Sequence, residues 1–374
     1  MLRFSEFSDN WKNTQLNEIA NFYKGKNISK SDIVKDGKIE CIRYGELYTN
    51  YGEVIEKIIS KTSLPKTDLV FSKANDIIIP SSGETQLDIA TASCVLKNDV
   101  ALGGDLNIIR TQQNGIFISY YLNSAKKRKI ASLAQGNSVV HLYNNQLASL
   151  YLNLPQEKEQ QKIASFLSSI DKKIELLQQK KSLLKDYKKG VMQQIFSQEL
   201  RFKPENGNEY PDWEEKKLGE ILKIGNGKDY KHLEKGEIPV YGTGGIMTYV
   251  NDFLYEGESV GIGRKGTIDK PVFLDGKFWT VDTLFYTYSF KKVLPKFIYF
   301  TFLGINWKRY NEASGVPSLS KATIGKIDVS IPSSEEQTQI ANFLSALDEK
   351  IALVNTQIEN TQEFKKGLLQ QMFV

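Results

Sequence analysis

Residues 154–167 read LPQEKEQQKIASFL, and the segment that they open continues to Phe196. Residues 331–344 read IPSSEEQTQIANFL, and this second segment continues to Phe373. The two segments align without a gap, because Pro332 follows Pro155 by 177 positions and Phe373 follows Phe196 by the same 177. A repeat that spans this much of a chain indicates a molecule built from two related halves.

Both segments carry the apolar pattern of a long helix. Their apolar residues recur at alternating spacings of four and three, which average to the 3.5-residue period of a coiled-coil seam. The proline near each start fits the first turn of a helix, where no N–H is needed. We therefore predict two helices of about 40 residues, each about 60 Å long. The residues predicted to pack helix against helix are Ile163, Leu167, Ile170, Ile174, Leu177 and Leu184 in the first segment and Ile340, Leu344, Leu347, Ile351, Val354 and Ile358 in the second.

Polar residues interrupt both seams. Lys181 and Lys188 stand at seam positions of the first segment, and Thr361 and Lys365 stand at seam positions of the second. These interruptions leave each helix marginal when it is alone. The alternative is a core helix of a globular domain, but the length of each segment and its narrow seam favour two helices packed on each other.

The remaining sequence forms two globular regions. We predict a first domain over residues 1–152, a central long helix over 153–200, a second domain over 201–330 and a C-terminal long helix over 331–374. The domains resemble each other only in outline, which duplication followed by divergence explains. The matching pairs are Trp11–Leu16 with Trp213–Leu218, Gly25-Lys26 with Gly227-Lys228, and Phe117–Tyr120 with Phe297–Phe300.

Both domains mix strand and helix patterns, which predicts an α+β fold. Turns are predicted at Asp36-Gly37 and Ser82-Gly83. Helical pieces are predicted at Phe117–Leu133 and at Lys296–Tyr310. The predicted strands are Ile39–Tyr44, Glu53–Ile59, Asp76–Pro80 and Asn107–Arg110 in the first domain and Val260–Gly263, Val272–Leu274 and Leu284–Tyr288 in the second.

Composition is ordinary for a globular protein. Of the 374 residues 40% are hydrophobic and 25% are charged, and the formal net charge of +5 permits an anionic partner without requiring one. Cys41 and Cys94 form no CxxC motif, so we expect neither a zinc site nor a disulfide framework. No apolar run reaches the roughly 18 residues of a membrane span, and Met1–Glu6 lack the pattern of a signal peptide. We therefore expect a cytoplasmic protein without a membrane partner.

The sequence lacks the motifs of common catalytic sites. His141 and His232 are its only histidines and are far apart, so we interpret them as ordinary surface or loop residues. Gly261–Gly266 spells GxGxxG, but a strand-like run follows where a dinucleotide site needs a helix. Pro211–Lys216 contains the letters of a nuclease motif, but its carboxylates are crowded and a turn is the better interpretation. We predict no catalytic site and no metal site.

Basic and polar residues gather on segments that are predicted to be loops. Lysine and arginine supply affinity for DNA that is independent of sequence, whereas polar side chains read base edges. A solvated surface explains a basic run alone equally well, and an ordinary turn explains a loop glycine almost as well as close approach to another backbone does. The candidate DNA-binding residues are Ser81, Ser82, Gly83, Lys126, Lys127, Arg128 and Lys129 in the first domain and Arg264, Lys265, Gly266, Lys308 and Arg309 in the second.

The whole chain resembles the specificity subunits of Type I restriction–modification systems. The resemblance is carried by [Leu/Ile]-Pro-x₄-Gln-x₂-Ile-Ala-x-Phe-Leu at the start of each long segment and by Lys-Lys-Gly-x₂-Gln-Gln-x-Phe at its end. Ile77–Gly83 and Gly261–Ile268 also resemble strand-and-turn hairpins of that family's target recognition domains. The resemblance implies two mixed α/β target recognition domains separated by two long antiparallel helices, with a pseudo-two-fold repeat.

The same resemblance implies a function. Each domain would read one half of a split sequence in double-stranded DNA, and the helices would set the distance between the halves. Two methyltransferase subunits would dock on this chain, and restriction/translocase subunits would join them. S-adenosylmethionine, ATP and Mg²⁺ would belong to those partners, with no cofactor in this chain. Two other classes stay open: a freestanding nuclease or methyltransferase, which the missing motifs disfavour, and a structural coiled-coil adaptor, for which two large divergent domains are more than is needed.

Overall fold

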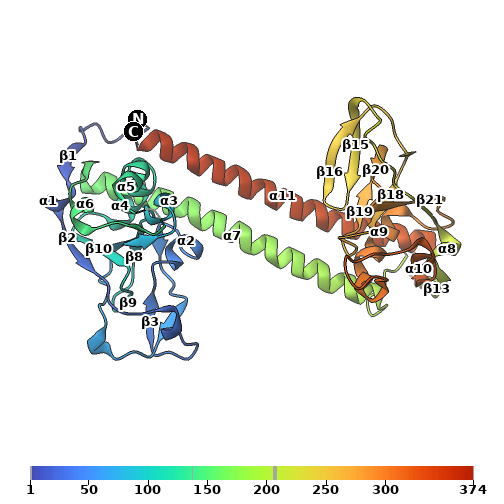
Figure 1. Cartoon of the computed structure of the whole chain (residues 1–374), viewed down its shortest axis with the longest axis horizontal. Coiled ribbons are helices and arrows are strands. Elements are labelled where there is room, and N and C mark those ends of the chain that lie inside the picture. Colours follow the sequence, from blue (N-terminus) through green and yellow to red (C-terminus); the bar gives the residue numbers. More distant parts are fainter. Residues whose placement is uncertain (1, 137, 205–208, 374) are drawn as a thin grey trace. The chain divides into compact units, whose positions relative to one another are not determined.

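The computed structural model describes residues 2–136, 138–204 and 209–373. The predicted domains and C-terminal helix include residues 1, 137, 205–208 and 374, which lie outside the described residues. The chain forms two compact units: unit 1 is Met1–Gln178 with Thr356–Val374, and unit 2 is Gln179–Asn355 (Figure 1). Each unit therefore contains one globular domain, part of the helix α7 (Glu157–Phe196) and part of the helix α11 (Ser334–Met372).

Unit 1 is built on a five-stranded sheet. Its central strand β6 (Asp76–Pro80) is buried throughout, as its continuous apolar run predicts. The sheet order is β2 (Ala20–Lys24), β10 (Leu106–Thr111), β6, β8 (Ser93–Val95) and β4 (Val54–Ile55). Smaller sheets join β5 (Ser60–Thr62), β3 (Ile39–Ile42) and β9 (Ala101–Leu102), β1 (Lys12–Gln15) with β12 (Tyr151–Leu154), and β7 (Ser82–Gly83) with β11 (Val140–His141). The helices are α1 (Leu16–Ile19), η1 (Lys30–Asp32), α2 (Glu46–Thr49), η2 (Lys66–Asp68), α3 (Gln86–Ile89), α4 (Gly115–Asn123), α5 (Lys127–Leu133) and α6 (Asn144–Ala148).

Unit 2 contains two four-stranded sheets. One has the order β14 (Lys223–Gly225), β21 (Leu284–Tyr288), β18 (Ser259–Gly263) and β19 (Val272–Leu274). The other has the order β16 (Gly245–Val250), β15 (Lys235–Gly242), β20 (Lys277–Thr280) and β17 (Tyr255–Glu256). β13 (Glu214–Lys217) pairs with β22 (Asp328–Ile331) as β1 pairs with β12 in unit 1. The helices are α8 (Leu218–Ile221), α9 (Pro295–Gly304), η3 (Trp307–Tyr310) and α10 (Lys321–Gly325).

Several local predictions need correction. The helix predicted over Phe117–Leu133 is two helices, because the backbone leaves the helical region at Ser124, with φ of −105° and ψ of −87°, where the Ser124 hydroxyl donates to the Tyr120 carbonyl. The helix predicted over Lys296–Tyr310 ends at Gly304 before the short helix η3. Ser82-Gly83 is a strand rather than a turn, and only Val54–Ile55 of the predicted strand Glu53–Ile59 pairs. The hairpin of β15 and β16 was not predicted.

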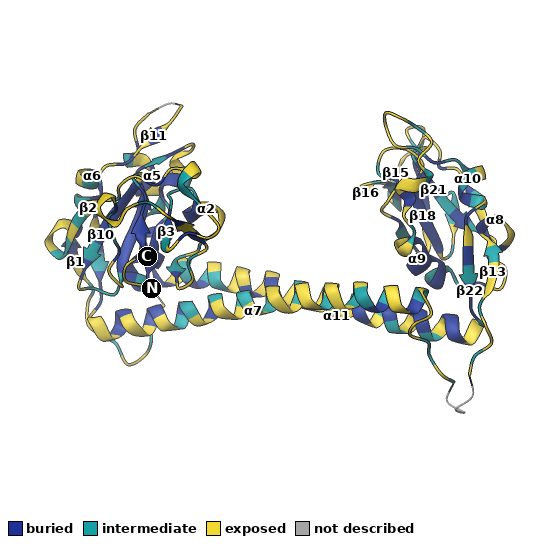
Figure 2. Ribbon diagram, turned by 90° about the horizontal axis from the view of Figure 1, so that it is seen from below, coloured by how far each residue is buried: buried dark blue, intermediate teal, exposed yellow. Residues whose placement is uncertain are grey.

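The two long helices run antiparallel. In unit 2 Lys181 of α7 bonds to Asn355 of α11, and Lys188 forms an ion pair with Asp348. From Lys181 to Lys188 the chain advances seven residues along α7, while the contacted residue on α11 moves back seven, from Asn355 to Asp348. Contacts in this order occur only between antiparallel helices. The prediction of two mixed α/β domains with two long antiparallel helices is therefore confirmed. Figure 2 shows buried and exposed residues alternating along both helices.

The predicted seam residues lie on the inner faces of the helices. In α7, Ile163, Leu167 and Ile170 are buried, whereas Ile174, Leu177 and Leu184 are half-buried. The opposite helix is not all that buries these residues, because part of each seam also packs on the core of a domain. The α11 residues that are buried are Ile340, Leu344, Leu347, Val354 and Ile358, and Ile351 is half-buried.

Two of the lysines that interrupt the seams, Lys188 and Lys365, also contact the domains. In unit 1 the Lys365 ammonium lies 2.7 Å from Asp171 of α7 and 3.0 Å from Glu53, and 5.2 Å from the ring centre of Tyr120. In unit 2 Lys188 pairs with Asp348 and lies 5.0 Å from the ring centre of Phe300. Lys365 and Asp348 follow Lys188 and Asp171 by 177 positions, so the same contact occurs twice.

An aromatic cluster in each unit receives the end of a long helix. In unit 1 the Phe373 ring lies 5.4 Å from Phe117 and 6.5 Å from Trp11, centre to centre. In unit 2 the corresponding rings are Phe196, Phe297 and Trp213, with centres 5.9 to 6.4 Å apart. Each domain core is thus completed by an aromatic residue at the C-terminal end of a long helix that begins in the other unit.

The matched glycines Gly25 and Gly227 allow two backbones to approach closely. A Cβ atom on Gly25 would lie 1.9 Å from the Gly103 carbonyl oxygen, and one on Gly227 would lie 1.9 Å from that of Val281. The next residue donates across the same contact, from Lys26 to Leu102 and from Lys228 to Thr280. The same close contact between two backbone segments therefore occurs in each unit, and it explains why both sequences have glycine there.

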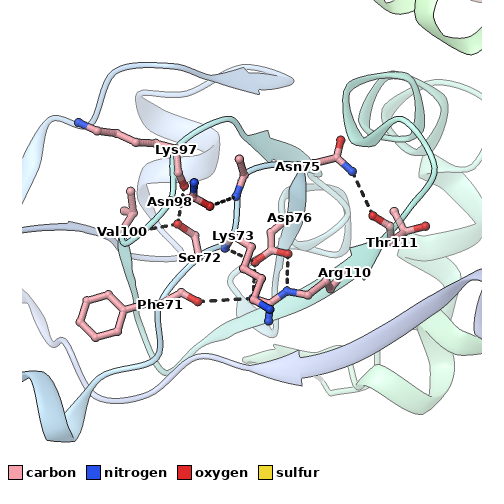
Figure 3. Close-up of polar contacts among 11 residues, drawn as sticks. Phe71, Ser72, Lys73, Asn75, Asp76, Lys97, Asn98, Val100, Arg110 and Thr111 are labelled. Atoms are coloured by element: carbon pink, nitrogen blue, oxygen red, sulfur yellow. Dashed lines mark hydrogen bonds and ion pairs between the residues drawn. The ribbon is translucent and has the colours of Figure 1, made fainter.

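A polar network stabilises the sheet of unit 1 (Figure 3). Asp76, on β6, is 1% exposed and accepts two hydrogen bonds from the Arg110 guanidinium, at 2.8 and 2.6 Å, and one from the Lys73 N–H. The Asp76 carboxylate raises the pKa of Arg110, chiefly through these side-chain hydrogen bonds. Arg110 also lies 4.9 Å from the ring centre of Tyr23, an exposed residue of β2. The ion pair is thus a structural contact that fixes Tyr23, and Arg110 is not an unpaired cation.

Candidate nucleic-acid interface

A loop of the same construction occurs in both units. We call Ser138–His141 in unit 1 and Gly315–Ser318 in unit 2 the valine loops, after Val139 and Val316. The Gln135 N–H donates to the His141 carbonyl at 2.9 Å, and the Glu312 N–H donates to the Ser318 carbonyl at 3.0 Å. These bonds join positions that differ by 177, so the offset of the helices extends back into the domains.

The valine loops pair with the predicted DNA-binding segments. His141 pairs with Ser82 in unit 1, and Ser318 pairs with Lys265 in unit 2. Ser82 and Lys265 therefore occupy equivalent positions. In unit 2 the Gly266 N–H donates to the Pro317 carbonyl at 2.8 Å, and Gly266 has a φ of +89°, which favours glycine.

The predicted basic residues of unit 2 lie on neighbouring loops. Arg264, Lys265, Lys308 and Arg309 are exposed, and Lys308 forms an ion pair of 3.1 Å with Asp269. The loop that follows Lys308 and Arg309 returns to Lys265 through Ser318. The structure thus links the two basic segments through Ser318 and through Asp269, and Lys308 is partly neutralised by Asp269.

Arg264 shares an aromatic ring with Lys321, a cation outside this group. The Arg264 guanidinium lies 5.9 Å and the Lys321 ammonium 6.0 Å from the ring centre of Phe285. Burial, and then the charge of Arg264, lowers the pKa of Lys321. An anion bound between the two cations would relieve their repulsion, so this point suits a phosphate group.

The predicted residues of unit 1 form two separate groups. Ser81 and Gly83 are buried and Ser82 is half-buried, so the Ser81 side chain does not reach the surface. Its position between Asp105 and Leu142, which it contacts through backbone hydrogen bonds, explains this burial. The second group, Lys126, Lys127, Arg128 and Lys129, begins α5, where Lys126 and Lys129 line a small hollow with Ser149–Tyr151.

Lys126 is held against an aromatic ring. Its ammonium lies 5.6 Å from the ring centre of Tyr121, and burial lowers its pKa. Lys127 is half-buried, whereas Arg128 and Lys129 are exposed. Of this group, Arg128 and Lys129 are therefore the best placed for a phosphate.

Sequence reasoning missed several exposed side chains near the loops. Val139 is 49% exposed and Val316 is 57% exposed. His141 stacks on the exposed Tyr143, with ring centres 6.3 Å apart and planes at 20°. Extending the 177-residue offset upstream of Pro155 would have matched Val139 with Val316 in the sequence alone.

Neither a metal centre nor a membrane helix is found in the part of the chain that the structure describes. Within those residues no three His, Cys, Asp or Glu side chains gather to hold a metal ion. No described helix is both long and apolar enough to span a membrane. Cys41 and Cys94 are buried free thiols, and burial raises their pKa to about 11 and about 12.

Known proteins share this architecture. The specificity subunit of the Type I restriction enzyme MjaVIII from Methanocaldococcus jannaschii is 22% identical, over 96% of this chain and 91% of its own. The S subunit of a Type I restriction–modification system from M. genitalium has the same fold, with a TM-score of 0.68, 19% identity and coverage of 98% of this chain and 96% of that one. A chain from a study of complex assembly and conformational transition of the type I R-M system gives a TM-score of 0.57 at 14% identity, covering 98% of this chain and 97% of that one.

The family assignment rests on the sequence of both halves. The profile of the Type I restriction modification DNA specificity domain matches residues 8–186 and again residues 210–362. These two matches cover most of the chain, and each contains one domain with most of the long helix that follows it. The chain therefore belongs to the family of Type I restriction–modification specificity subunits.

Proposed function

We propose that this chain recognises a bipartite DNA sequence, with one half read by each unit. The observation that supports this most directly is that equivalent positions on equivalent loops carry different side chains. Ser82 corresponds to Lys265, and His141 corresponds to Ser318. One scaffold that presents different polar groups to base edges would select two different half-sites.

The proposed role is recognition without catalysis. S-adenosylmethionine, ATP and Mg²⁺ would then bind partner subunits, and the complex would act in the cytoplasm. The test is methyl transfer to genomic DNA by the pure chain, by its methyltransferase and by both together. Methylation at one bipartite sequence is expected only from the mixture, and methyl transfer by the pure chain would contradict the proposal.

Two methyltransferase subunits are the proposed partners of the long helices, and restriction/translocase subunits would join that core. The helices expose apolar residues in pairs related by 177 positions. Leu176 and Leu353 are 53% and 60% exposed, and Tyr187 and Phe364 are exposed to a similar degree. Unit 1 contains Leu176 and Phe364, and unit 2 contains Leu353 and Tyr187, so each unit presents one leucine and one aromatic ring. Two copies of one partner fit such a duplicated surface.

Replacing one exposed leucine should remove one partner. With Leu353→Asp we expect one methyltransferase bound per chain instead of two, because a carboxylate in the contact would be desolvated without a partner. The Leu176→Asp variant should also bind one methyltransferase, and the double variant Leu176→Asp, Leu353→Asp should bind none. Mass measurement by light scattering tests this, with the exposed Leu200→Asp as control. Two methyltransferases on the double variant would refute this docking surface.

Removing cations from unit 2 should weaken binding to any DNA sequence. For the triple variant Arg264→Ala, Lys265→Ala, Arg309→Ala we expect the slope of log affinity against log salt to fall by about 0.9 for each phosphate that is no longer neutralised. Lys291→Ala with Lys292→Ala removes exposed charge from another part of unit 2 and serves as control. An unchanged slope in the triple variant would place the DNA elsewhere.

A further inference from the structure

We propose that the valine loops enter a groove of the DNA and that Val139 and Val316 contact the bases. This inference rests on the proposed function, because it assumes that DNA is the partner. It adds the side chains that reach the base edges and the kind of contact that they make. Valine has no hydrogen-bonding group, so its contacts would be with a thymine methyl group or the face of a partly unstacked base pair.

The first support is that the arrangement occurs twice. Val139 and Val316 are related by the offset of 177, and both are about half exposed. A single exposed valine on a surface needs no explanation. Here two domains that otherwise diverged expose the same apolar side chain at the same point of the same loop. An apolar contact made by both units explains the agreement.

The second support is that both loops are held closed before any ligand binds. In unit 1 the N–H groups of Gln135 and His141 each donate to the other's carbonyl, at 2.9 and 2.7 Å. In unit 2 the Asn311 side chain accepts from the Ser318 N–H at 2.9 Å, beside the bond from Glu312 to Ser318. A closed loop with a stiff β-branched side chain loses little conformational freedom on binding.

The third support is the character of the neighbouring side chains. In unit 2 Lys265 pairs with the loop directly, and Arg264 lies next to it in the sequence. These cations would hold phosphates on either side of a groove that Val316 enters. In unit 1 Ser82 stands where unit 2 has Lys265, and His141 at the end of the valine loop stacks on Tyr143. The Asn144 amide, next to Tyr143, donates to the Tyr23 carbonyl at 3.0 Å. The valine loop of unit 1 is thus followed by a stacked pair of rings, whereas that of unit 2 pairs with a cation.

The loops also have the right position within unit 1. Figure 2 shows β11, which holds the end of the valine loop, on the side of unit 1 that faces away from α7. The proposed methyltransferase contacts are on the helices, so DNA and protein partner would use different surfaces. The pair Ser82 and His141 would then flank Val139, as Lys265 and Ser318 flank Val316, and these flanking residues would distinguish the half-sites.

A site-specific crosslink tests the contact. Single cysteines replace Val139, Val316 or Ile59, an exposed residue elsewhere in unit 1. A benzophenone maleimide labels only the new thiol, because Cys41 and Cys94 are buried and protonated at neutral pH. Each labelled chain is assembled with its methyltransferase and irradiated on a duplex that carries the sequence located by methylation mapping. Crosslinks are expected from positions 139 and 316, each to a different half-site, and at least ten-fold more than from position 59.

Substitution provides a second measurement. Val139→Asp should weaken binding about ten-fold through the half-site of unit 1, and Val316→Asp should do so through the half-site of unit 2. Ile59→Asp should bind as the unchanged complex does. Crosslinking at positions 139 and 316 no greater than at position 59, with full affinity of both valine variants, would overturn the inference. An unchanged complex that prefers no DNA sequence would instead refute the proposed function.

Discussion

Replacement of Lys365 by alanine is expected to lower the free energy of unfolding of unit 1 by about 2 kcal/mol, because it leaves two half-buried carboxylates without their cation. The Lys365 side chain is 15% exposed, and it pairs with Glu53 at 3.0 Å and with Asp171 at 2.7 Å. Asp171 also accepts from the Tyr120 hydroxyl. The loss would therefore reach α4, α7 and the strand β4 next to Glu53.

Lys366→Ala is the matched control, because Lys366 is the next residue and is exposed. Thermal or urea unfolding of both variants gives the difference. Lys188→Ala should destabilise unit 2 by a smaller amount, since Lys188 has Asp348 as its acidic partner and that carboxylate is more exposed than Asp171. Equal stability of the Lys365→Ala and Lys366→Ala variants would show that the ion pairs of Lys365 do not make a net stabilising contribution.

The pH dependence gives an independent check. Burial opposes the charge of Lys365, but Glu53 and Asp171 outweigh burial and raise the pKa of its ammonium. A cation whose pKa is raised by folding stabilises the fold at all pH values below its unfolded pKa, about 10.4, and stops doing so as pH rises through the folded pKa. The unchanged chain should therefore lose stability steeply above about pH 10, and the Lys365→Ala variant should lose less in that range.

The long helices could be predicted from sequence because their pattern is long, periodic and present twice. Their start was placed slightly early: α7 begins at Glu157, and Pro155 lies just before it, where its carbonyl accepts from the Gln160 amide at 2.9 Å. Lys188 and Lys365 were interpreted as flaws in the seam, because an apolar seam pattern indicates only how one helix packs on another. Their carboxylate and aromatic partners come from distant segments, and no local spacing shows such contacts.

The candidate interface was harder to predict for a related reason. Basic runs are visible in sequence, but exposure and pairing across a loop are not. Ser81 was chosen as a loop residue and is buried, since its backbone is bonded to Asp105 and Leu142. Val139 and His141 carry no charge pattern. The 177-residue offset matches Val139 with Val316, but only the pairing of the valine loop with Ser82 places it beside a predicted DNA-binding segment. The residues proposed to contact bases follow from this pairing and not from composition.

A fragment of residues 1–200 is expected to form a homodimer that recognises an inverted repeat. In unit 1 the end of α11 fills a place on the first domain through Lys365, Leu368, Met372 and Phe373. The fragment lacks α11, but its own α7 carries the corresponding residues 177 positions earlier, which are Lys188, Val191, Ile195 and Phe196. Each copy can therefore supply the missing helix end to the other through an isologous contact.

The dimer should be weaker than the native pairing. An uncovered seam exposes apolar surface at a cost of about 25 cal/mol per Å², which drives the two copies together. However, both helices of the dimer would carry Lys181, where the native partner α11 has the buried Ile358. Sedimentation over a range of concentrations should show a monomer–dimer equilibrium, and Lys181→Ile should shift it toward the dimer.

With its methyltransferase, the dimer would present the first domain twice. The methylated sequence should then consist of the half-site of unit 1 and the same sequence inverted, since an isologous contact relates the two domains by a two-fold axis. Phe196→Ala tests the docking, because Phe196 must take the place of Phe373 beside Trp11 and Phe117. A folded fragment that stays monomeric at high concentration, or a dimer that still methylates the original asymmetric sequence, would show that the two halves are not interchangeable in this way.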